Sequence, residues 1–219
     1  MSKLPQWPLS GSTSIFLIAA GGMQALSLAW PFEGMFKGEP QGWLQCVSLA
    51  LLAGLVDRSQ SKNEAFLKAW LFAVVWLGGS FWWLFISMNT YGGLHATLSV
   101  MAVLLLASGL AIIYGVAAAA YHAVVQTGVG ILLRASAFAA AWTLAELVRG
   151  TLWTGFPWGA VGYAHVDSLL RHWAPWVGVY GLCALSAFLA MAVAAERKDY
   201  RSTQRRTQAA FAVMGAMLG

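Results

Sequence analysis

Long apolar stretches separated by short polar segments dominate this chain. A helix needs roughly 20 apolar residues to cross a bilayer, and most of these stretches approach that length. Because a lipid-exposed backbone must satisfy its own hydrogen bonds, the pattern predicts helices throughout. We therefore predict an all-α integral membrane protein, a polytopic helical bundle with six complete transmembrane spans and a truncated seventh. The predicted spans cover approximately 14–31, 41–56, 66–87, 96–121, 131–149 and 174–195, with 208–219 incomplete.

Composition and charge support this class of protein. Apolar residues make up 59% of the chain and charged residues only 10%, against about 25% charged residues in a soluble domain. The basic residues collect in loops rather than on one face, so the net charge of +5 does not indicate a nucleic-acid partner. Segments on one side of the predicted bundle hold Lys3, Arg58, Lys62, Lys68, Arg134, Arg197, Lys198, Arg201, Arg205 and Arg206, and those on the other hold Lys37, Arg149 and Arg171. The positive-inside rule then predicts a cytoplasmic N-terminus and places loop 150–173 outside.

Two costly charges stand near the end of the fifth predicted span. Glu146 and Arg149 are three residues apart, so they share a helix face and can pair. Glu146 lies about 15 residues into the span, or roughly 22 Å at 1.5 Å per residue, which places the pair near the outer interface. Charged groups in a membrane need a partner or a function. Two interpretations remain open: an interfacial ion pair that anchors the helix end, or a lipid-headgroup site or support for the outer loop.

The loop after this span is unusually aromatic. Pro157 fixes φ and ends a helix, while the neighbouring glycines permit tight turns. The aromatic side chains are too apolar for an open aqueous loop, so we expect them on or in the outer leaflet, or folded back into the bundle. The loop is interpreted either as part of an aromatic belt or as the wall of a cleft for an acyl chain. The residues concerned are Thr154, Gly155, Phe156, Pro157, Trp158 and Tyr163.

A second outer turn has a similar composition. Tyr91 precedes Gly92 and Gly93, directly after a Trp-rich third span. Both outer segments therefore combine aromatic residues with turn residues on the same side of the membrane. The same two interpretations apply: a lipid-facing assembly that includes Tyr91, or an ordinary aromatic girdle.

Other reactive side chains give no site by their spacing. In the outer loop, His165, Asp167 and His172 match no metal-ligand pattern, so we predict no metal site and no cofactor. A serine and a histidine four residues apart lack the orienting group and oxyanion hole that a nucleophile needs. The two cysteines lie in apolar spans, where burial disfavours the thiolate, and we interpret them as packing residues. These side chains are His165, Asp167 and His172; Ser168 with His172; and Cys46 and Cys183.

Together these segments resemble the apolipoprotein N-acyltransferase family, which carries out the last step of bacterial lipoprotein maturation. The most specific feature is a Glu-x-x-Arg-Gly helix end, Glu146 to Gly150, followed by the Thr-Gly-Phe-Pro-Trp run 154–158. The resemblance extends in order over nearly the whole chain. Its supporting motifs are Gly162-Tyr163; Trp82-Trp83 with Ser87 and Thr90-Tyr91-Gly92-Gly93; Gly178-Val179-Tyr180-Gly181; and the run from Leu26 through Pro31 to Phe32.

The resemblance implies a particular architecture and chemistry. Members of the family have a helical part in the bacterial inner membrane that carries a periplasmic, nitrilase-like domain, so loop 150–173 would face the periplasm. A cysteine in the Glu–Lys–Cys triad of that domain takes an acyl chain from a phospholipid as a thioester. The acyl chain then passes to the N-terminal diacylglyceryl-cysteine of a lipoprotein. The implied partners are a phospholipid donor and a diacylglyceryl apolipoprotein acceptor.

The chain departs from the family at its C-terminus. In the family the nitrilase-like domain follows the seventh span, whereas this chain ends at Gly219 within that span, which we interpret as truncation. The triad has no counterpart here. We therefore predict no catalytic residue in 1–219 and no acyltransferase activity for the chain alone. Under this interpretation Glu146, Arg149 and the aromatic loop form or support a lipid entrance.

Two other hypotheses remain. One is a non-enzymatic polytopic membrane protein, a lipid-binding or transporter subunit. Transporters usually place ionisable residues or broken helices near the midplane, which the position of the Glu146–Arg149 pair disfavours. The other is the membrane half of a split acyltransferase, with the catalytic domain on a separate chain.

Overall fold

The computed structural model describes the backbone of residues 9–218 except Trp30, Phe32, 34–36, 126–128 and Trp153. Side chains are described up to Glu196. Lys3, Trp153 and Gly219, together with the side chains of the incomplete seventh stretch, lie outside the described residues.

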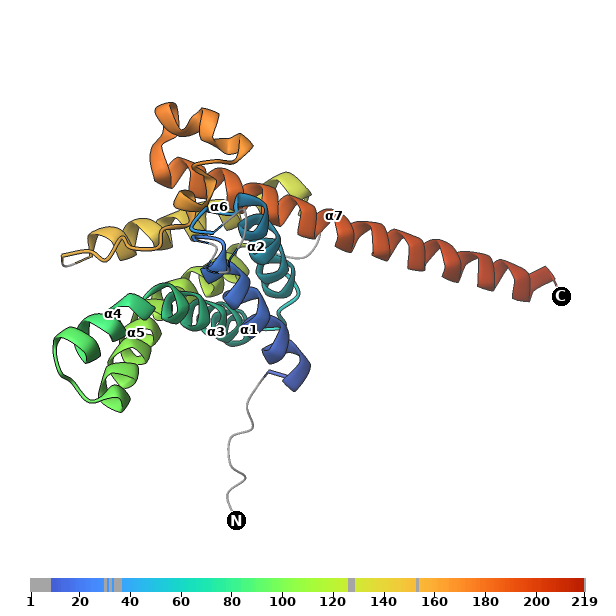
Figure 1. Ribbon diagram of the computed structural model, residues 1–219. Helices are drawn as coiled ribbons and strands as arrows, with labels where there is room; N and C mark the ends of the chain where they lie inside the picture. The colour runs from blue at the N-terminus through green and yellow to red at the C-terminus, as the bar shows by residue number, and fades with distance from the viewer. Residues whose placement is uncertain are drawn as a thin grey trace, which may run out of the picture.

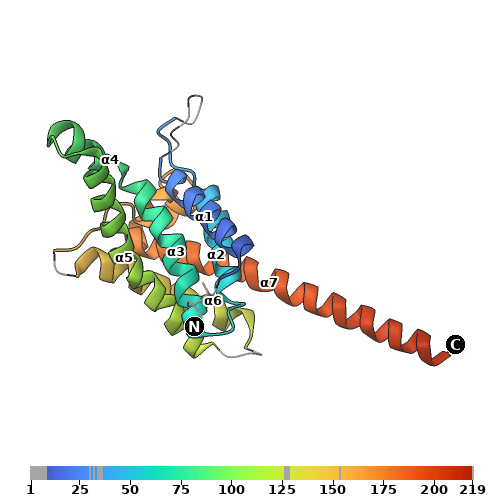
Figure 2. The same ribbon diagram turned by 90° about the horizontal axis from the view of Figure 1, so that it is seen from below.

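All elements in the described ranges are helices, which confirms the all-α prediction (Figure 1). Figures 1 and 2 show α3 between α1 and α5, and the helix pairs with the most extensive packing are α3 with α5 and α6 with α7. The α-helices are α1 Gly11–Leu26, α2 Gly42–Val56, α3 Lys62–Ser80, α4 Trp82–Ile86, α5 Ala96–Val124, α6 Ile131–Thr151 and α7 Ala174–Leu218. The π-helical turn η1 covers Ser87–Tyr91, and the 3₁₀ turns η2 and η3 cover Val161–His165 and Leu169–Trp173.

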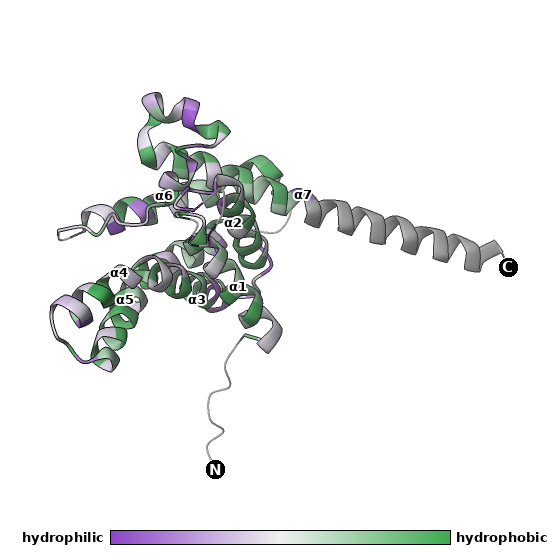
Figure 3. Ribbon diagram, in the orientation of Figure 1, coloured by the Kyte–Doolittle hydropathy of each residue, from purple (hydrophilic) through white to green (hydrophobic). Residues whose placement is uncertain are grey.

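Fewer helices in the structure are long and apolar enough to span a membrane than the sequence predicts. Three helices are long and apolar enough to cross a bilayer: Ala96–Val124, Ile131–Thr151 and Leu169–Glu196. A fourth is reached if the bent pair Lys62–Ser80 and Trp82–Tyr91 counts as one span. Apolar residues, green in Figure 3, also line the shorter helices α1 and α2. The structure thus supports a membrane protein, while the number of six complete spans stays a prediction.

The predicted third span, 66–87, is interrupted in the structure. α3 ends at Ser80, and the chain continues into α4 with a bend of 51°. The break follows Gly78 and Gly79, and glycine is among the poorest helix formers. Gly79 also allows close packing, because a Cβ there would lie 2.8 Å from the Cβ of Ala25 on α1. Gly79 therefore permits the close contact between α3 and α1, next to the point where the span bends.

The sixth predicted span, 174–195, lies within α7 but does not begin as a regular helix. Gly178 has φ 63° and ψ −172°, so the chain turns sharply after the first residues of α7. Glycine adopts this left-handed conformation without the steric cost that a Cβ adds. Beyond 195 the backbone stays helical to Leu218, through residues that the sequence analysis left between two spans.

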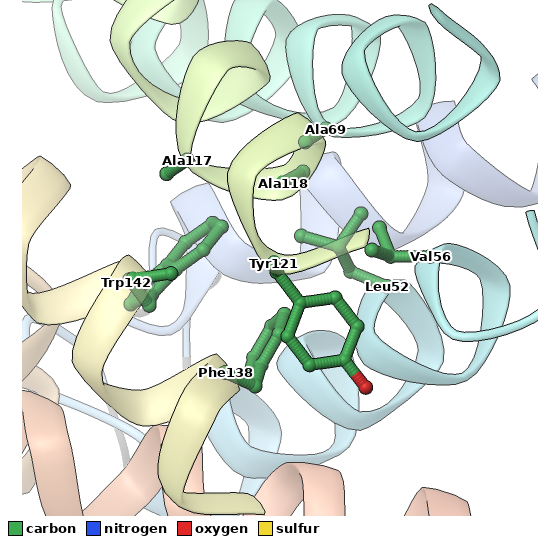
Figure 4. Close-up of a pocket in the computed structure, with 9 residues that line it drawn as sticks. Leu52, Val56, Ala69, Ala117, Ala118, Tyr121, Phe138 and Trp142 are labelled. Carbon is green, nitrogen blue, oxygen red and sulfur yellow. The ribbon is translucent and has the colours of Figure 1, made fainter. Parts of the chain in front are cut away.

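The end of the bundle that carries residues 154–173 is here called the loop end. At the opposite end a buried polar group joins α2, α5 and α6. The Tyr121 hydroxyl donates to Asp57 Oδ1 at 2.8 Å, and Arg134 Nη1 lies 3.6 Å from Asp57 Oδ2. Figure 4 shows the Tyr121 ring beside Phe138 and Leu52, around an apolar cavity of only about 10 Å³. The described core around this cavity is therefore closely packed.

Candidate functional site

The centre of the bundle holds a cluster of large aromatic side chains. Trp76 on α3 stacks on Trp142 of α6 with ring centroids 6.1 Å apart, and both contact the Tyr114 ring of α5. Phe72 and Phe138 extend the cluster on either side of Trp142. Large rings that interdigitate in this way bury much apolar area and fix three helices relative to one another. The polar site of the molecule is built directly on this rigid support.

Glu146 and Arg149 lie on the inner face of α6, one turn apart. Arg149 Nη2 donates to Glu146 Oε2 at 3.0 Å, and both side chains are fully buried in the protein. The predicted pairing of the two charges is therefore present. Both charged groups are enclosed by protein, so in this structure a lipid headgroup could not contact them directly, while their depth near the outer interface stays a prediction.

Tyr114 completes the buried pair, and the sequence analysis did not single it out. Its hydroxyl donates to Glu146 Oε1 at 2.5 Å and accepts from Arg149 Nε at 2.7 Å. The Arg149 guanidinium also lies 5.9 Å from the Trp76 ring centroid, a cation–π distance. A phenol in the middle of a long apolar helix was the only sequence signal, because residues 114 and 146 are far apart along the chain.

Arg149 also holds the backbone of the aromatic loop. Its Nη1 donates to the carbonyl oxygens of Phe156 and Trp158, the latter at 2.8 Å. In return, the backbone N–H of Phe156 donates to the carbonyl of Arg149 at 2.8 Å. One guanidinium thus satisfies a carboxylate, a phenol and two loop carbonyls, and such charge-assisted hydrogen bonds are about twice as strong as neutral ones. The side chain ties the loop to the end of α6.

One side of the 154–163 loop packs against the helices, and the other side is exposed. The Phe156 ring packs edge-on against Phe81, with centroids 4.8 Å apart, and is half-buried. Trp158 and Tyr163 are 55% and 50% exposed, and Thr154 is exposed as well. Gly155 makes the turn with φ 73°, next to the half-buried Pro157. The arrangement presents aromatic surface outward while the backbone beneath it is fixed.

Tyr91 does not join this group. It is 84% exposed, and among the helical elements η1 packs against α4 and α5. The structure therefore brings Glu146, Arg149 and the 154–163 loop together and leaves Tyr91 on a separate part of the loop end.

His165 follows the loop directly and has partners that the sequence analysis missed. Its Nε2 lies 2.8 Å from Gln45 Oε1 on α2, and its Nδ1 lies 3.0 Å from Ser168 Oγ. Ser168 thus pairs with His165 rather than with His172, and the sequence analysis, which found no nucleophile–base site at Ser168 and His172, did not anticipate this contact. Within the described residues no three His, Cys, Asp or Glu side chains are grouped to hold a metal ion.

Acid is expected to destabilise the protein through His165. Burial lowers the pKa of His165 from 6.5 to about 4. The unfolded chain binds this proton first, so stability is complete above pH 6.5 and falls by about 3 kcal/mol as pH drops to 4. Thermal unfolding of wild type and His165→Asn in detergent between pH 7.5 and 4 measures the difference. The exposed His172→Asn serves as the control, and equal pH dependence in all three proteins would contradict the assignment.

Comparison with known proteins identifies the family of this chain. The family described as the apolipoprotein N-acyltransferase N-terminal domain matches residues 15–192, which include the whole Arg149 network. An apolipoprotein N-acyltransferase of Verminephrobacter eiseniae is 48% identical over 181 residues, covering 80% of this chain and 32% of the relative. One of Ralstonia nicotianae is 42% identical over 160 residues, covering 71% and 30%.

The chain spans about a third of the length of these relatives. The matched region includes the Glu-x-x-Arg-Gly helix end of α6 and the loop that Arg149 holds. On these grounds the chain belongs to the apolipoprotein N-acyltransferase family.

Proposed function

We propose that this chain is the membrane portion of a bacterial apolipoprotein N-acyltransferase. The whole enzyme would transfer an acyl chain from a phospholipid to the N-terminal diacylglyceryl-cysteine of a lipoprotein. The match of the family's N-terminal domain to residues 15–192 carries this proposal. By the resemblance, the bond-making groups belong to a nitrilase-like domain, and the residues described here hold and admit its lipid substrates.

The proposal includes a topology. We propose a multi-pass protein of the inner membrane with a cytoplasmic N-terminus, six complete spans and the beginning of a seventh. The loop end would then face the periplasm. The distribution of basic residues between the two sides supports this orientation, and the antiparallel course of the helices is compatible with it.

The aromatic loop is the proposed lipid entrance, and the buried pair is its support. Arg149 and Glu146 are inaccessible, so they act on lipid through the backbone they fix. The exposed rings of Trp158 and Tyr163 supply an apolar surface at the height of the membrane interface, where such rings are favoured. In this interpretation Thr154, Gly155, Phe156 and Pro157 shape the turn. The separate position of Tyr91 makes it an aromatic contact to lipid outside the loop.

A chimaera tests the proposed function. Residues 1–219 replace the corresponding membrane part of the Verminephrobacter eiseniae relative, which is 48% identical over the aligned region. We expect the chimaera to acylate a diacylglyceryl peptide with a phospholipid donor, and the chain alone to give no product. Acylation by the isolated chain would refute the division of roles. A folded chimaera that is inactive beside the active parent would count against the family function.

Trp158→Ala in that chimaera tests the entrance. The Trp158 carbonyl stays with Arg149, so the fold should persist, while the loss of the exposed ring should lower turnover at limiting phospholipid several-fold. Trp176→Ala is the matched control, because Trp176 is 85% exposed and lies outside the loop. Unchanged dependence on phospholipid concentration in Trp158→Ala would reduce the ring to a membrane anchor.

A further inference from the structure

A second potential site lies at the loop end, on the side of the bundle formed by α2 and α7. A cavity of about 600 Å³ opens between the first residues of α2, the segment 165–172 and the wall of α7. This volume is within the range of small-molecule sites in proteins. Among the described residues that line it, none belongs to the Arg149 network or to the 154–163 loop. The cavity is therefore distinct from the proposed entrance.

The rim of the cavity is charged. Arg171 and His172 line it from η3, and both are exposed at the loop end. Asp167 also lines it, so the rim carries a carboxylate as well as a guanidinium. A guanidinium matches phosphate oxygens with paired N–H donors, whereas a carboxylate matches a cationic group. A ligand with one phosphate and one ammonium group would complement this rim better than a purely anionic one.

One side of the cavity is apolar. Cys46 and Trp43 line it from α2, and Leu189 lines it from α7. Trp43 is 63% and Leu189 46% exposed, so this side of the cavity is open to the surrounding membrane. The cavity thus has a polar end and an apolar, laterally open side.

The floor of the cavity is held in place. His165 lines it and is fixed by Gln45 and Ser168. Gly42 lets α2 approach this segment, because a Cβ there would lie only 2.7 Å from His165 Nδ1. The contact between α2 and the loop segment is therefore close, and the site needs no rearrangement to form.

We propose that this cavity binds one zwitterionic phospholipid of the adjacent leaflet, with its phosphate at Arg171 and His172 and an acyl chain along Trp43, Cys46 and Leu189. The charge pattern of the rim selects the headgroup, and the apolar wall accepts a chain that enters sideways from the bilayer. The site is separate from the entrance beside Trp158, and it does not depend on the proposed enzymatic function.

Alkylation of Cys46 tests the proposal in the purified chain. Cys46 lines the cavity and is partly accessible, whereas Cys183 is 1% exposed, so a maleimide should report on Cys46. Peptide mass identifies the modified cysteine, and Cys46→Ser gives the background. The probe is a short-chain phosphatidylcholine added to protein in maltoside detergent. We expect it to slow alkylation of Cys46 about tenfold, the effect of occupancy near 90%.

Two charge-reversal variants show whether the rim is responsible. Arg171→Glu should alkylate at the wild-type rate without lipid but should lose the protection by phosphatidylcholine. Lys37→Glu is the matched control, because Lys37 is another cation of the predicted outer segments but does not line the cavity. Protection that persists in Arg171→Glu, or that is lost equally in Lys37→Glu, overturns the proposal.

Two further probes separate a lipid from other occupants. Octyl glucoside has an apolar chain without a phosphate, and equal protection by it would show a plain apolar groove and overturn the proposal. Equal protection by inorganic phosphate alone would show a site for a free anion and overturn it too. Protection by phosphatidylcholine with little effect from either control supports a phospholipid site.

Discussion

Replacing Arg149 by alanine is expected to lower the free energy of unfolding by about 3–5 kcal/mol, because removal of one partner leaves a buried charge uncompensated. Glu146 would keep its buried carboxylate but lose the guanidinium at 3.0 Å. The Tyr114 hydroxyl would lose the Nε donor at 2.7 Å. The carbonyls of Phe156 and Trp158 would lose their donor as well. Few single side chains in this molecule satisfy so many groups at once.

Unfolding of the purified chain in a mixed-detergent titration measures this effect. Arg58→Ala is the matched control, since Arg58 is exposed at the opposite end of the bundle and should change stability by less than about 0.5 kcal/mol. Arg149→Lys should fall between wild type and alanine, because an ammonium keeps the charge but cannot reach partners on both edges of a planar guanidinium. A loss in Arg149→Ala no larger than in Arg58→Ala would contradict the described network.

The double variant Glu146→Ala/Arg149→Ala separates pairing from loop support. Removing both charges abolishes the uncompensated carboxylate, so the double variant should be more stable than the sum of the two single losses predicts. The loop carbonyls stay without their donor in either case. Limited proteolysis should therefore cleave near residues 154–160 in both Arg149→Ala and the double variant. Loop cleavage that returns to the wild-type rate in the double variant would show that Arg149 does not hold the loop.

The sequence was sufficient for the helices and for the pairing within α6. Apolar stretches of near-membrane length located most of the α-helices, because the length of an apolar run and the backbone's need for internal hydrogen bonds are local properties of the chain. Spacing alone put Glu146 and Arg149 on one helix face. Boundaries were less accurate where local sequence competes with packing. The third predicted span is interrupted just after Gly78 and Gly79, and Gly79 packs closely against α1.

The partners of the pair could not be predicted in the same way. Tyr114 and Glu146 are 32 residues apart, and His165 and Gln45 are 120 residues apart. Such contacts depend on how helices are placed against one another, which hydrophobic periodicity does not encode. The same limit explains why the burial of Arg149 within the protein was not predicted. The sequence placed Arg149 correctly near the end of its helix. The direction in which its side chain points depends on contacts with α3 and α5, which the sequence does not show.

Replacing Gly155 by alanine is the second change with a large expected effect. Gly155 has φ 73°, and a Cβ there would overlap the carbonyl oxygen of Gly150. The obstructing atom belongs to the backbone of α6, so no side-chain rotation relieves the overlap. The left-handed conformation costs a non-glycine residue about 1–2 kcal/mol. The displacement needed to clear Gly150 adds the loss of the hydrogen bond from Arg149 Nη1 to the Phe156 carbonyl, about 1.5–3 kcal/mol.

Gly93→Ala separates these two contributions. Gly93 also has a left-handed φ, 67°, but nothing lies within 4 Å of its Cβ position. The free energy of unfolding of Gly93→Ala should therefore fall by only about 1–2 kcal/mol, the cost of the left-handed backbone conformation. The structure around residue 93 should not change. Gly155→Ala should lose more stability than Gly93→Ala and should expose the 154–160 segment to protease as Arg149→Ala does. Equal losses in the two glycine variants would mean that the turn at Gly155 is not pressed against α6. In that case the hydrogen bonds from Arg149 would not be what holds the loop in a fixed conformation.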